Sequence, residues 1–299
     1  MARNYTTFVG FPNVGNAIYF VRASFGAQNW RNNPMSLLSN VQTGVKARPL
    51  RAVICGPEGS GKTTLCVGAP KPIVLTTEDG LGLLDAPSLS AESYPHVNAL
   101  LDELTASEHD YRSLVIDAID GIEPLIFSDI CEHGNKKNIA DFGFNKGYVQ
   151  ADDYWVRFFH RLDELRAKRR MNIIVISHVS ANHIDDPVVG TYVRYEPNLH
   201  KRTVPLLTKW ADLVGYLAPM RSARDEGDET KNRTVRVSQN SRARFLHVYD
   251  DGRFIAKNRF GLEEPIEIPI SNGWAAVSSA IAERFAAVKA TNKQKENEK

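Results

Sequence analysis

The sequence predicts an α/β fold with a mainly parallel sheet, helices on both faces of that sheet and an antiparallel edge near the C-terminus. From Arg51 onward, apolar segments of strand length alternate with helical or loop segments, which is typical of a covered parallel sheet. A glycine-rich loop directly follows the first of these strands. After the fifth strand the chain changes to short β-like runs separated by turn-rich segments, which indicates the antiparallel edge.

The glycine-rich loop has the pattern of a phosphate-binding loop. Residues 56–63 read GPEGSGKT, which fits G-x-x-x-x-G-K-[ST] at every fixed position. Glycines permit positive φ angles, so that successive backbone N–H groups can face one phosphate, and the following helix adds its dipole. Lys62 is expected to neutralise the β- and γ-phosphates, and Thr63 to offer its hydroxyl to Mg²⁺. The expected nucleotide-binding residues are Gly56, Pro57, Glu58, Gly59, Ser60, Gly61, Lys62, Thr63 and Thr64.

Composition narrows the class of protein. The 299 residues carry 37 basic and 35 acidic side chains, so a nucleic-acid surface would have to be a local patch. Three cysteines, Cys55, Cys66 and Cys131, form no C-x-x-C pair and are too few for a disulfide framework. The N-terminus lacks a leader pattern, and no apolar run approaches the roughly 18 residues of a membrane helix. We expect a soluble cytoplasmic protein without a membrane partner.

The elements follow in chain order. Residues 1–49 show no sustained period apart from a strand-like run at 17–21, and we interpret them as an N-terminal extension. An ATPase core is expected over residues 50–270, and a C-terminal helix with a charged tail over 271–299. Strands are expected at 52–55, 72–77, 114–117, 172–177 and 213–218, and helices at 63–68, 97–104, 154–168 and 275–288. The apolar stripe of the helix at 154–168 is expected in the core.

Two short β-like runs, 216–220 and 234–238, enclose the charged, turn-rich segment 221–232. This arrangement predicts a hairpin with that segment at its tip. The segment from 244 to 255 is expected to continue the antiparallel edge.

Polar residues end several of the parallel strands, where open sheets bind their ligands. Glu78 follows the second strand and is expected to deprotonate the water that attacks the γ-phosphate, with Asp79 as the alternative. Asp117 ends the third strand and is expected to hold Mg²⁺ opposite Thr63, with Asp120 as the alternative. These residue types at these strand ends predict metal-assisted phosphoryl transfer.

His178 ends the fourth strand. If that strand lies between the first and the third, His178 is expected to face the γ-phosphate and to report hydrolysis to the segment that follows. That segment, 179–206, is predicted as a long functional loop, and 133–148 as a second one. Both mix basic and aromatic residues, which suits single-stranded DNA, although a solvated lid remains the alternative for each. The expected DNA-binding residues are Lys136, Lys137, Lys146, Arg194, Lys201 and Arg202.

Near the C-terminal edge, residues 257–261 read KNRFG. Lys257 and Arg259 point the same way on an extended segment, so both can reach phosphates, which we expect to be those of an adjacent subunit.

Taken together, these residues resemble the RecA-like ATPases, and most closely the single-domain phage AAA-type ATP-binding proteins and Sak-type annealing recombinases. The resemblance spans residues 49–269 and rests on GPEGSGKTT, Glu78, LVIDA, the strand ending at His178 and WADLVGYL at 210–217, in that order. KNRFG is similar to the motif of the RadA-type branch-migration helicases, whose cations serve a neighbour's nucleotide and the DNA.

The resemblance implies an ATP- and Mg²⁺-dependent ATPase that forms rings or filaments as a homo-oligomer. It further implies binding of single-stranded DNA and annealing or strand exchange during phage recombination in the host cytoplasm, with a single-strand-binding or replication protein as a candidate partner. The chain departs from the helicases, because it has a long N-terminal extension and no separate DNA-binding domain or zinc module. An ATP-gated loader and a small-molecule P-loop kinase are the competing hypotheses.

Overall fold

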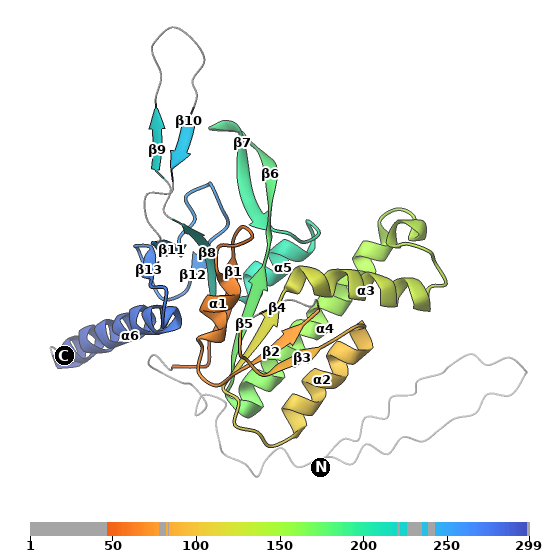
Figure 1. Cartoon of the computed structure of the whole chain (residues 1–299), viewed down its shortest axis with the longest axis horizontal. Helices are drawn as coiled ribbons and strands as arrows, with labels where there is room; N and C mark the ends of the chain where they lie inside the picture. Colours follow the sequence, from red (N-terminus) through yellow and green to blue (C-terminus); the bar gives the residue numbers. More distant parts are fainter. Residues whose placement is uncertain are drawn as a thin grey trace, which may run out of the picture. The chain divides into compact units, whose positions relative to one another are not determined.

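The computed structural model (Figure 1) describes residues 47–77, 82, 84–219, 222–225, 235–238 and 243–297. The strand expected at 17–21 and nearly all of the N-terminal extension lie outside these residues, as do Glu78 and Asp79.

A mainly parallel sheet forms the centre of the described structure. Its parallel strands lie in the order β8, β1, β5, β4, β2, β3. They are β8 (Leu213–Pro219), β1 (Arg51–Cys55), β5 (Asn172–Ser177), β4 (Ser113–Asp117), β2 (Pro72–Thr76) and β3 (Ser88–Ser90). The first five are the strands predicted from the sequence, whereas β3 was not predicted. β5 lies between β1 and β4, as the prediction for His178 required.

An antiparallel edge continues the sheet beyond β8, as predicted. β11 (Arg244–His247) and β12 (Lys257–Asn258) both pair with β8, and β13 (Ile266–Ile268) pairs with β11. The predicted hairpin between 216–220 and 234–238 is wrong in its first strand. Instead β9 (Ser222–Asp225) pairs with β10 (Val235–Ser238), because the 216–219 run belongs to β8 and pairs with β1 and β11.

Helices cover both faces of the sheet, as predicted. One face carries α1 (Lys62–Val67) and α6 (Gly273–Asn297), and the other carries α2 (Tyr94–Ala106), α3 (Ile119–His133), α4 (Lys146–Arg169) and α5 (Thr203–Trp210). Side chains of β1 alternate between the two layers, with Ala52 and Ile54 toward α1 and α6, and Val53 and Cys55 toward the other helices. The sheet is thus buried on both sides, which explains its continuous apolar strands.

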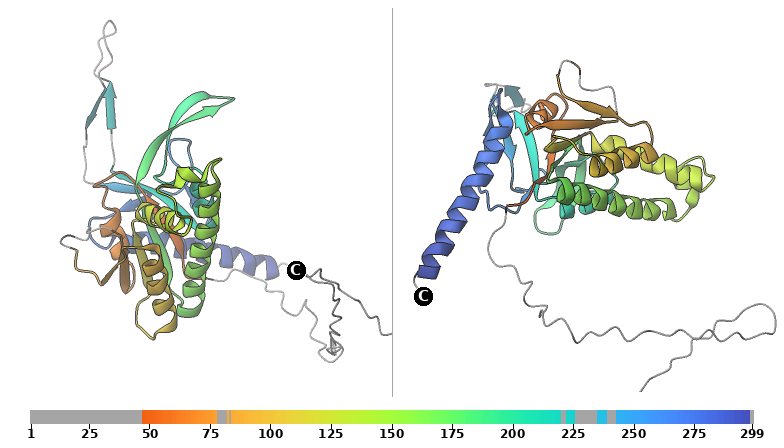
Figure 2. Two further views of the ribbon diagram at one scale, coloured as in Figure 1. Left: turned by 90° about the vertical axis from the view of Figure 1, so that its right-hand side faces the viewer. Right: turned by 90° about the horizontal axis from the view of Figure 1, so that it is seen from below.

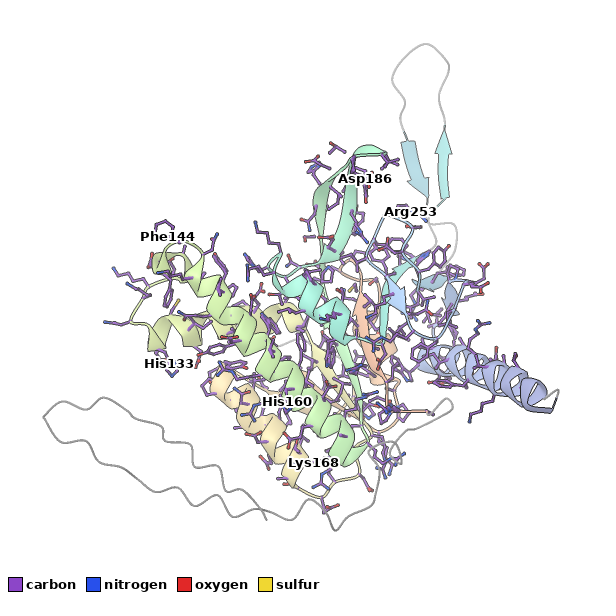
Figure 3. The ribbon with its side chains drawn as sticks, turned by 180° about the vertical axis from the view of Figure 1, so that it is seen from behind. His133, Phe144, His160, Lys168, Asp186 and Arg253 are labelled. Atoms are coloured by element: carbon purple, nitrogen blue, oxygen red, sulfur yellow. The ribbon has the colours of Figure 1, made fainter. Side chains whose placement is uncertain are left out.

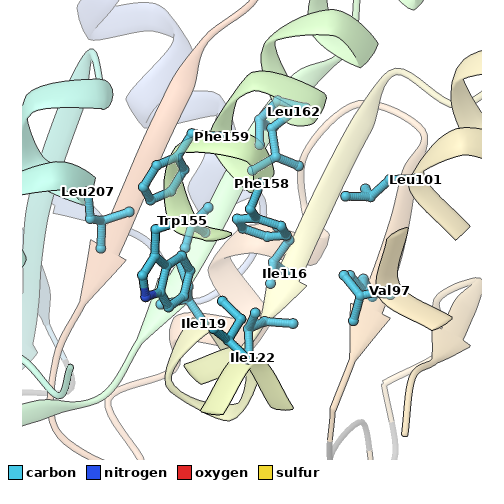
Figure 4. Packing of buried hydrophobic residues seen from close by; sticks show 14 of the residues in the cluster. Val97, Leu101, Ile116, Ile119, Ile122, Trp155, Phe158, Phe159, Leu162 and Leu207 are labelled. Atoms are coloured by element: carbon cyan, nitrogen blue, oxygen red, sulfur yellow. The ribbon is translucent and has the colours of Figure 1, made fainter. Parts of the chain in front are cut away.

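The larger core lies between the sheet and helices α2 to α5. Trp155 and Phe159 on α4 stack at 5.7 Å between ring centroids, and Phe159 stacks on Trp210 of α5 at 5.0 Å. Figure 4 shows Trp155 and Phe159 together with Ile119 on α3 and Val97 on α2. The apolar stripe of α4 is therefore core, as predicted.

α6 packs on the sheet through its first turns only. Trp274 and Val277 are buried, whereas most residues from 282 to 291 are exposed, and Figure 2 shows the helix running away from the sheet. Within the described residues no helix is long and apolar enough to cross a membrane.

The segment predicted as one long loop, 179–206, is a β-hairpin followed by the start of α5. β6 (Val179–Asp186) pairs with β7 (Gly190–Pro197) over their full lengths, with Asp186 opposite Gly190 next to the turn. The other predicted loop, 133–148, contains the single 3-10 turn η2 (Ile139–Phe142) and the start of α4.

Candidate nucleotide-binding site

The phosphate-binding loop leaves β1 and enters α1 with the backbone geometry that its glycines permit. Gly59 has φ of 69° and Gly61 has φ of 87°, a region that favours glycine. A Cβ atom on Gly56 would lie 2.4 Å from the carbonyl oxygen of Leu217 in β8, so only glycine lets the loop pass this close to the neighbouring strand. The sequence pattern therefore has its expected physical basis in the loop.

Two buried side chains of the loop suit a phosphate ligand. Ser60 is 5% exposed, and its Oγ has no hydrogen-bond partner within the described residues. Lys62 is 6% exposed, and its Nζ donates to the carbonyl oxygens of Gly56 and Pro57, each at 2.9 Å. Burial lowers the pKa of Lys62, and the negative charges of Asp117 and Asp120 act in the opposite direction. An orphaned hydroxyl and a desolvated ammonium in one small loop fit an anion such as the phosphate chain of a nucleotide.

The carboxylate predicted to hold Mg²⁺ lies next to the predicted hydroxyl ligand. Thr63 Oγ1 donates a hydrogen bond to Asp117 Oδ2 at 2.7 Å, which joins the start of α1 to the end of β4. Oxygen ligands of this kind are the ones that Mg²⁺ prefers. The pair would hold the metal of a bound Mg²⁺–nucleotide, whose chemistry is to neutralise charge on the phosphates.

Asp120, the alternative metal ligand, instead contacts His178. Its Oδ1 accepts a hydrogen bond from the backbone N–H of His178 at 3.0 Å, and its Oδ2 lies 2.7 Å from the ring Nδ1. Asp120 stands in the first turn of α3, so the carboxylate fixes the orientation of the imidazole at the end of β5. Whether His178 faces the γ-phosphate stays a prediction.

A second carboxylate of α3 supports the segment that follows the β6–β7 hairpin. Glu123 is 9% exposed and accepts hydrogen bonds from the backbone N–H of His200, at 2.9 and 3.1 Å, and from Thr203 Oγ1 at 2.9 Å. Burial raises the pKa of Glu123, while these hydrogen bonds favour its ionised form. The sequence analysis did not single out Glu123, because an acidic residue inside a helix has no distinguishing pattern.

The base predicted at Glu78 and its alternative Asp79 lie outside the described residues. The residue before them, Thr77, shows where the end of β2 lies. A Cβ atom on Gly121 would lie 2.0 Å from Thr77 Oγ1, so β2 ends directly against the first turn of α3. The role of Glu78 stays a prediction.

The predicted DNA-binding cations fall into two groups. Lys136, Lys137, Lys146 and Lys201 are exposed, and among the described residues no carboxylate pairs with their side chains. Arg194 pairs with Asp250 and Arg202 with Asp152. Two of the six are thus partly neutralised within the chain.

The two segments that carry these cations meet in space. The Tyr148 ring on α4 stacks on His200, with centroids 4.3 Å apart and planes at 5°. Lys146 lies two residues before Tyr148 in the sequence, and Lys201 directly follows His200. Burial and the charge of Lys201 lower the pKa of His200, which keeps its ring neutral at pH 7. Figure 3 shows Phe144, which is 97% exposed, at the outer end of the α3–α4 connection, and Asp186 at the outer end of the hairpin.

Lys257 and Arg259 lie beside the N-terminal end of β8, whereas the loop of their own chain follows the C-terminal end of the neighbouring strand β1. β12 pairs with the first residues of β8, and Lys257 Nζ donates to the carbonyl oxygens of Thr208, Lys209 and Ala211 at 2.7, 3.2 and 3.0 Å. Arg259 pairs with Asp212 at 2.9 Å. Contact with the nucleotide of a neighbouring subunit stays a prediction.

One residue at the loop was missed by the sequence analysis. Arg244 at the start of β11 places its guanidinium beside Gly61, where a Cβ atom would lie 2.1 Å from Nη1. No motif marks Arg244, and only the folding of the antiparallel edge brings it to the loop.

Comparisons with known proteins identify a matching family and similar solved structures. The family model described as an AAA domain matches residues 48–260. A search of curated proteins found no match. Similar solved structures include the RadB recombinase, with 16% sequence identity, a TM-score of 0.40 and coverage of 76% of this chain and 90% of that one. They also include the flagellar accessory protein FlaH from Methanocaldococcus jannaschii, with 10% identity, a TM-score of 0.36 and coverage of 74% and 86%. With a complete phosphate-binding loop, a strand order that places β5 between β1 and β4, and the family match over 48–260, the chain belongs to the AAA domain family of P-loop ATPases.

Proposed function

We propose that the protein is a Mg²⁺-dependent ATPase that binds single-stranded DNA and couples nucleotide turnover to annealing or strand exchange in phage recombination. The observation that carries the ATPase part is the hydrogen bond from Thr63 to Asp117 beside the buried Lys62. Thr63 and Asp117 would hold the metal, and Lys62 would neutralise the phosphates beside them.

In this proposal each residue has a stated task. Ser60 and the backbone of the loop bind the phosphates, and Lys62 neutralises the charge that develops on them. Thr63 and Asp117 orient the metal ion, while Glu78 deprotonates the attacking water. His178, held by Asp120, responds to the γ-phosphate.

The DNA part is supported by the meeting of two segments that the sequence analysis selected separately. The stacked pair of Tyr148 and His200 brings together the two segments that carry the exposed Lys146 and Lys201. Aromatic faces with flanking cations suit bases and phosphates of a single strand. Lys136 and Lys137 extend the same positive charge along the α3–α4 connection.

Steady-state ATP hydrolysis with and without single-stranded DNA tests the proposal. Lys62→Ala is expected to abolish nucleotide binding. Lys146→Ala combined with Lys201→Ala is expected to keep basal hydrolysis and to lose most of the stimulation by DNA. Lys289→Ala on α6 is the matched control and is expected to behave as the parent protein.

Two outcomes would contradict the DNA part. A parent protein whose hydrolysis does not respond to single-stranded DNA would favour the loader or the kinase. DNA affinity that does not fall with rising salt would exclude phosphate contacts by the lysines.

The homo-oligomer requires its own test, since Lys257 and Arg259 would act on a neighbour's nucleotide. Subunits with Lys62→Ala and subunits with Arg259→Ala are each expected to be inactive alone. A mixture would regain activity if sites are shared, because some interfaces then combine an intact loop with an intact Arg259. Mixtures that stay inactive would argue against shared sites.

A further inference from the structure

We propose that Arg244, in the antiparallel edge, is a ligand of the nucleotide phosphates bound by the same chain. This inference rests on the proposed nucleotide site and adds to it a residue that no sequence motif marks. Its basis is the position of the Arg244 guanidinium beside the last glycine of the phosphate-binding loop.

The contact between Arg244 and Gly61 is close. A Cβ atom built on Gly61 would lie 2.1 Å from Nη1, 3.3 Å from Cζ and 3.8 Å from Cδ of Arg244. The outer part of the arginine side chain therefore lies along the backbone of Gly61. Gly61 also has φ of 87°, a backbone angle that favours glycine at this position.

The backbone holds Arg244 in this place. It opens β11, where its Cα pairs with Pro219 of β8 and Ile268 of β13. One nitrogen of the guanidinium is also held by a hydrogen bond, since Nη2 donates to the carbonyl oxygen of Pro269 at 3.0 Å. Nη1, the nitrogen nearest Gly61, forms no hydrogen bond within the described residues and is available to a ligand.

The charge of Arg244 has no counterion among the described residues. The guanidinium forms no ion pair there, and its one hydrogen bond goes to a neutral carbonyl. Two other half-buried arginines, Arg51 and Arg166, both pair with Asp212. An unpaired guanidinium next to a phosphate-binding loop, close to the buried Lys62, favours an anion with oxygens for its planar fork.

The consequence is that the antiparallel edge forms part of the nucleotide site. β8 closes on Gly56 through the Leu217 carbonyl, and β11 closes on Gly61 through Arg244. The loop is thus contacted at both glycines that its sequence pattern fixes, by β8 at Gly56 and by the antiparallel edge at Gly61.

Equilibrium binding tests the inference, with ATP and ADP titrated in the presence of Mg²⁺ by calorimetry. Loss of one charge-assisted hydrogen bond is expected to weaken the affinity of Arg244→Ala for both nucleotides by about 10-fold to 100-fold. Arg244→Lys keeps the charge without the fork and is expected to lie between this variant and the parent. Arg284→Ala is the matched control, because Arg284 also lies against a glycine of positive φ, Gly261, but on α6.

A second readout separates binding from folding. The rise in unfolding temperature that ATP produces is expected to be smaller for Arg244→Ala than for the parent, whatever the temperature without nucleotide. If Arg244→Ala does not fold, Arg244→Gln and Arg244→Lys carry the same comparison.

Nucleotide binding by the parent protein separates a failure of the Arg244 inference from a failure of the proposed function. A parent protein that binds no nucleotide would overturn the proposed function itself. A parent that binds ATP, together with an Arg244→Ala variant that binds it equally well, would overturn only the role of Arg244. Tighter binding by Arg244→Ala would also overturn it, because Arg244 would then occupy the place of the phosphates.

Discussion

Replacing Lys257 by alanine is expected to destabilise the fold, independently of any role toward a neighbouring subunit. The last carbonyl groups of a helix lack intrahelical partners, and Lys257 Nζ satisfies those of Thr208 and Lys209 and the adjacent one of Ala211. A cation at a partly buried helix C-terminus contributes up to about 2 kcal/mol. Burial, followed by the charge of Arg259, lowers the pKa of Lys257, so desolvation offsets part of the gain.

The net loss expected for Lys257→Ala is about 1–2 kcal/mol in the free energy of unfolding. For a domain of this size that corresponds to a decrease in unfolding temperature of roughly 2–8 °C. Urea denaturation monitored by circular dichroism measures the loss. Lys209→Ala is the control: this exposed lysine lies at the same helix end, and its loss should stay within about 0.5 kcal/mol.

An unfolding free energy of Lys257→Ala equal to that of the parent would refute the reasoning. The result also decides how activity data are interpreted. If Lys257→Ala is destabilised, a loss of ATP hydrolysis must be measured well below its unfolding temperature before it is assigned to shared active sites.

Three further predictions concern the nucleotide site and Asp212, which directly precedes β8. Asp117→Asn is expected to keep nucleotide binding but to raise the Mg²⁺ concentration needed for it, and an unchanged Mg²⁺ titration would contradict the metal role. Glu78→Gln is expected to bind ATP and lose turnover, so normal hydrolysis by this variant would exclude Glu78 as the base. Burial raises the pKa of Asp212, but hydrogen bonds from Arg51 and the charges of two further arginines outweigh it and hold the pKa below 3.8. The contribution of ionised Asp212 to stability is therefore present above about pH 3.8 and is lost as the pH falls further. Asp212→Asn should lower the free energy of unfolding by about 3 kcal/mol at pH 7. Urea denaturation of this variant should also depend less on pH below about pH 4 than that of the parent.

The local parts of the fold could be predicted because their signals are local. The loop at 56–63 has fixed glycines at fixed spacing, and β1, β4 and β5 are continuous apolar runs because both faces of the sheet are buried. The hairpin of β6 and β7 was not predicted, since its strands carry polar side chains at many positions instead of a continuous apolar run. α3 was also missed, because Pro124 interrupts a run that otherwise reads as helical.

The parts of the site that were missed depend on long-range contacts. Asp120 and His178 are 58 residues apart, and their pairing follows from the position of α3 above the end of β5. Arg244 reaches Gly61 only after β11 has paired with β8. In both cases the residue types are common and their separation in the sequence is variable, so no sequence pattern predicts the contact.

The direct connection from β5 to β6 has a thermodynamic consequence. His178 alone separates the central strand from the hairpin, and its carbonyl accepts a hydrogen bond from Asn198 where the hairpin returns. Both ends of the hairpin are therefore anchored at a residue held by Asp120 near the phosphate-binding loop. If nucleotide binding shifts this anchor, it changes the affinity of the hairpin for a ligand bound there. That ligand must then change the affinity for nucleotide by the same factor. The hairpin and the phosphate-binding loop would then be two ends of one reciprocal equilibrium, and measuring either end would report on the other.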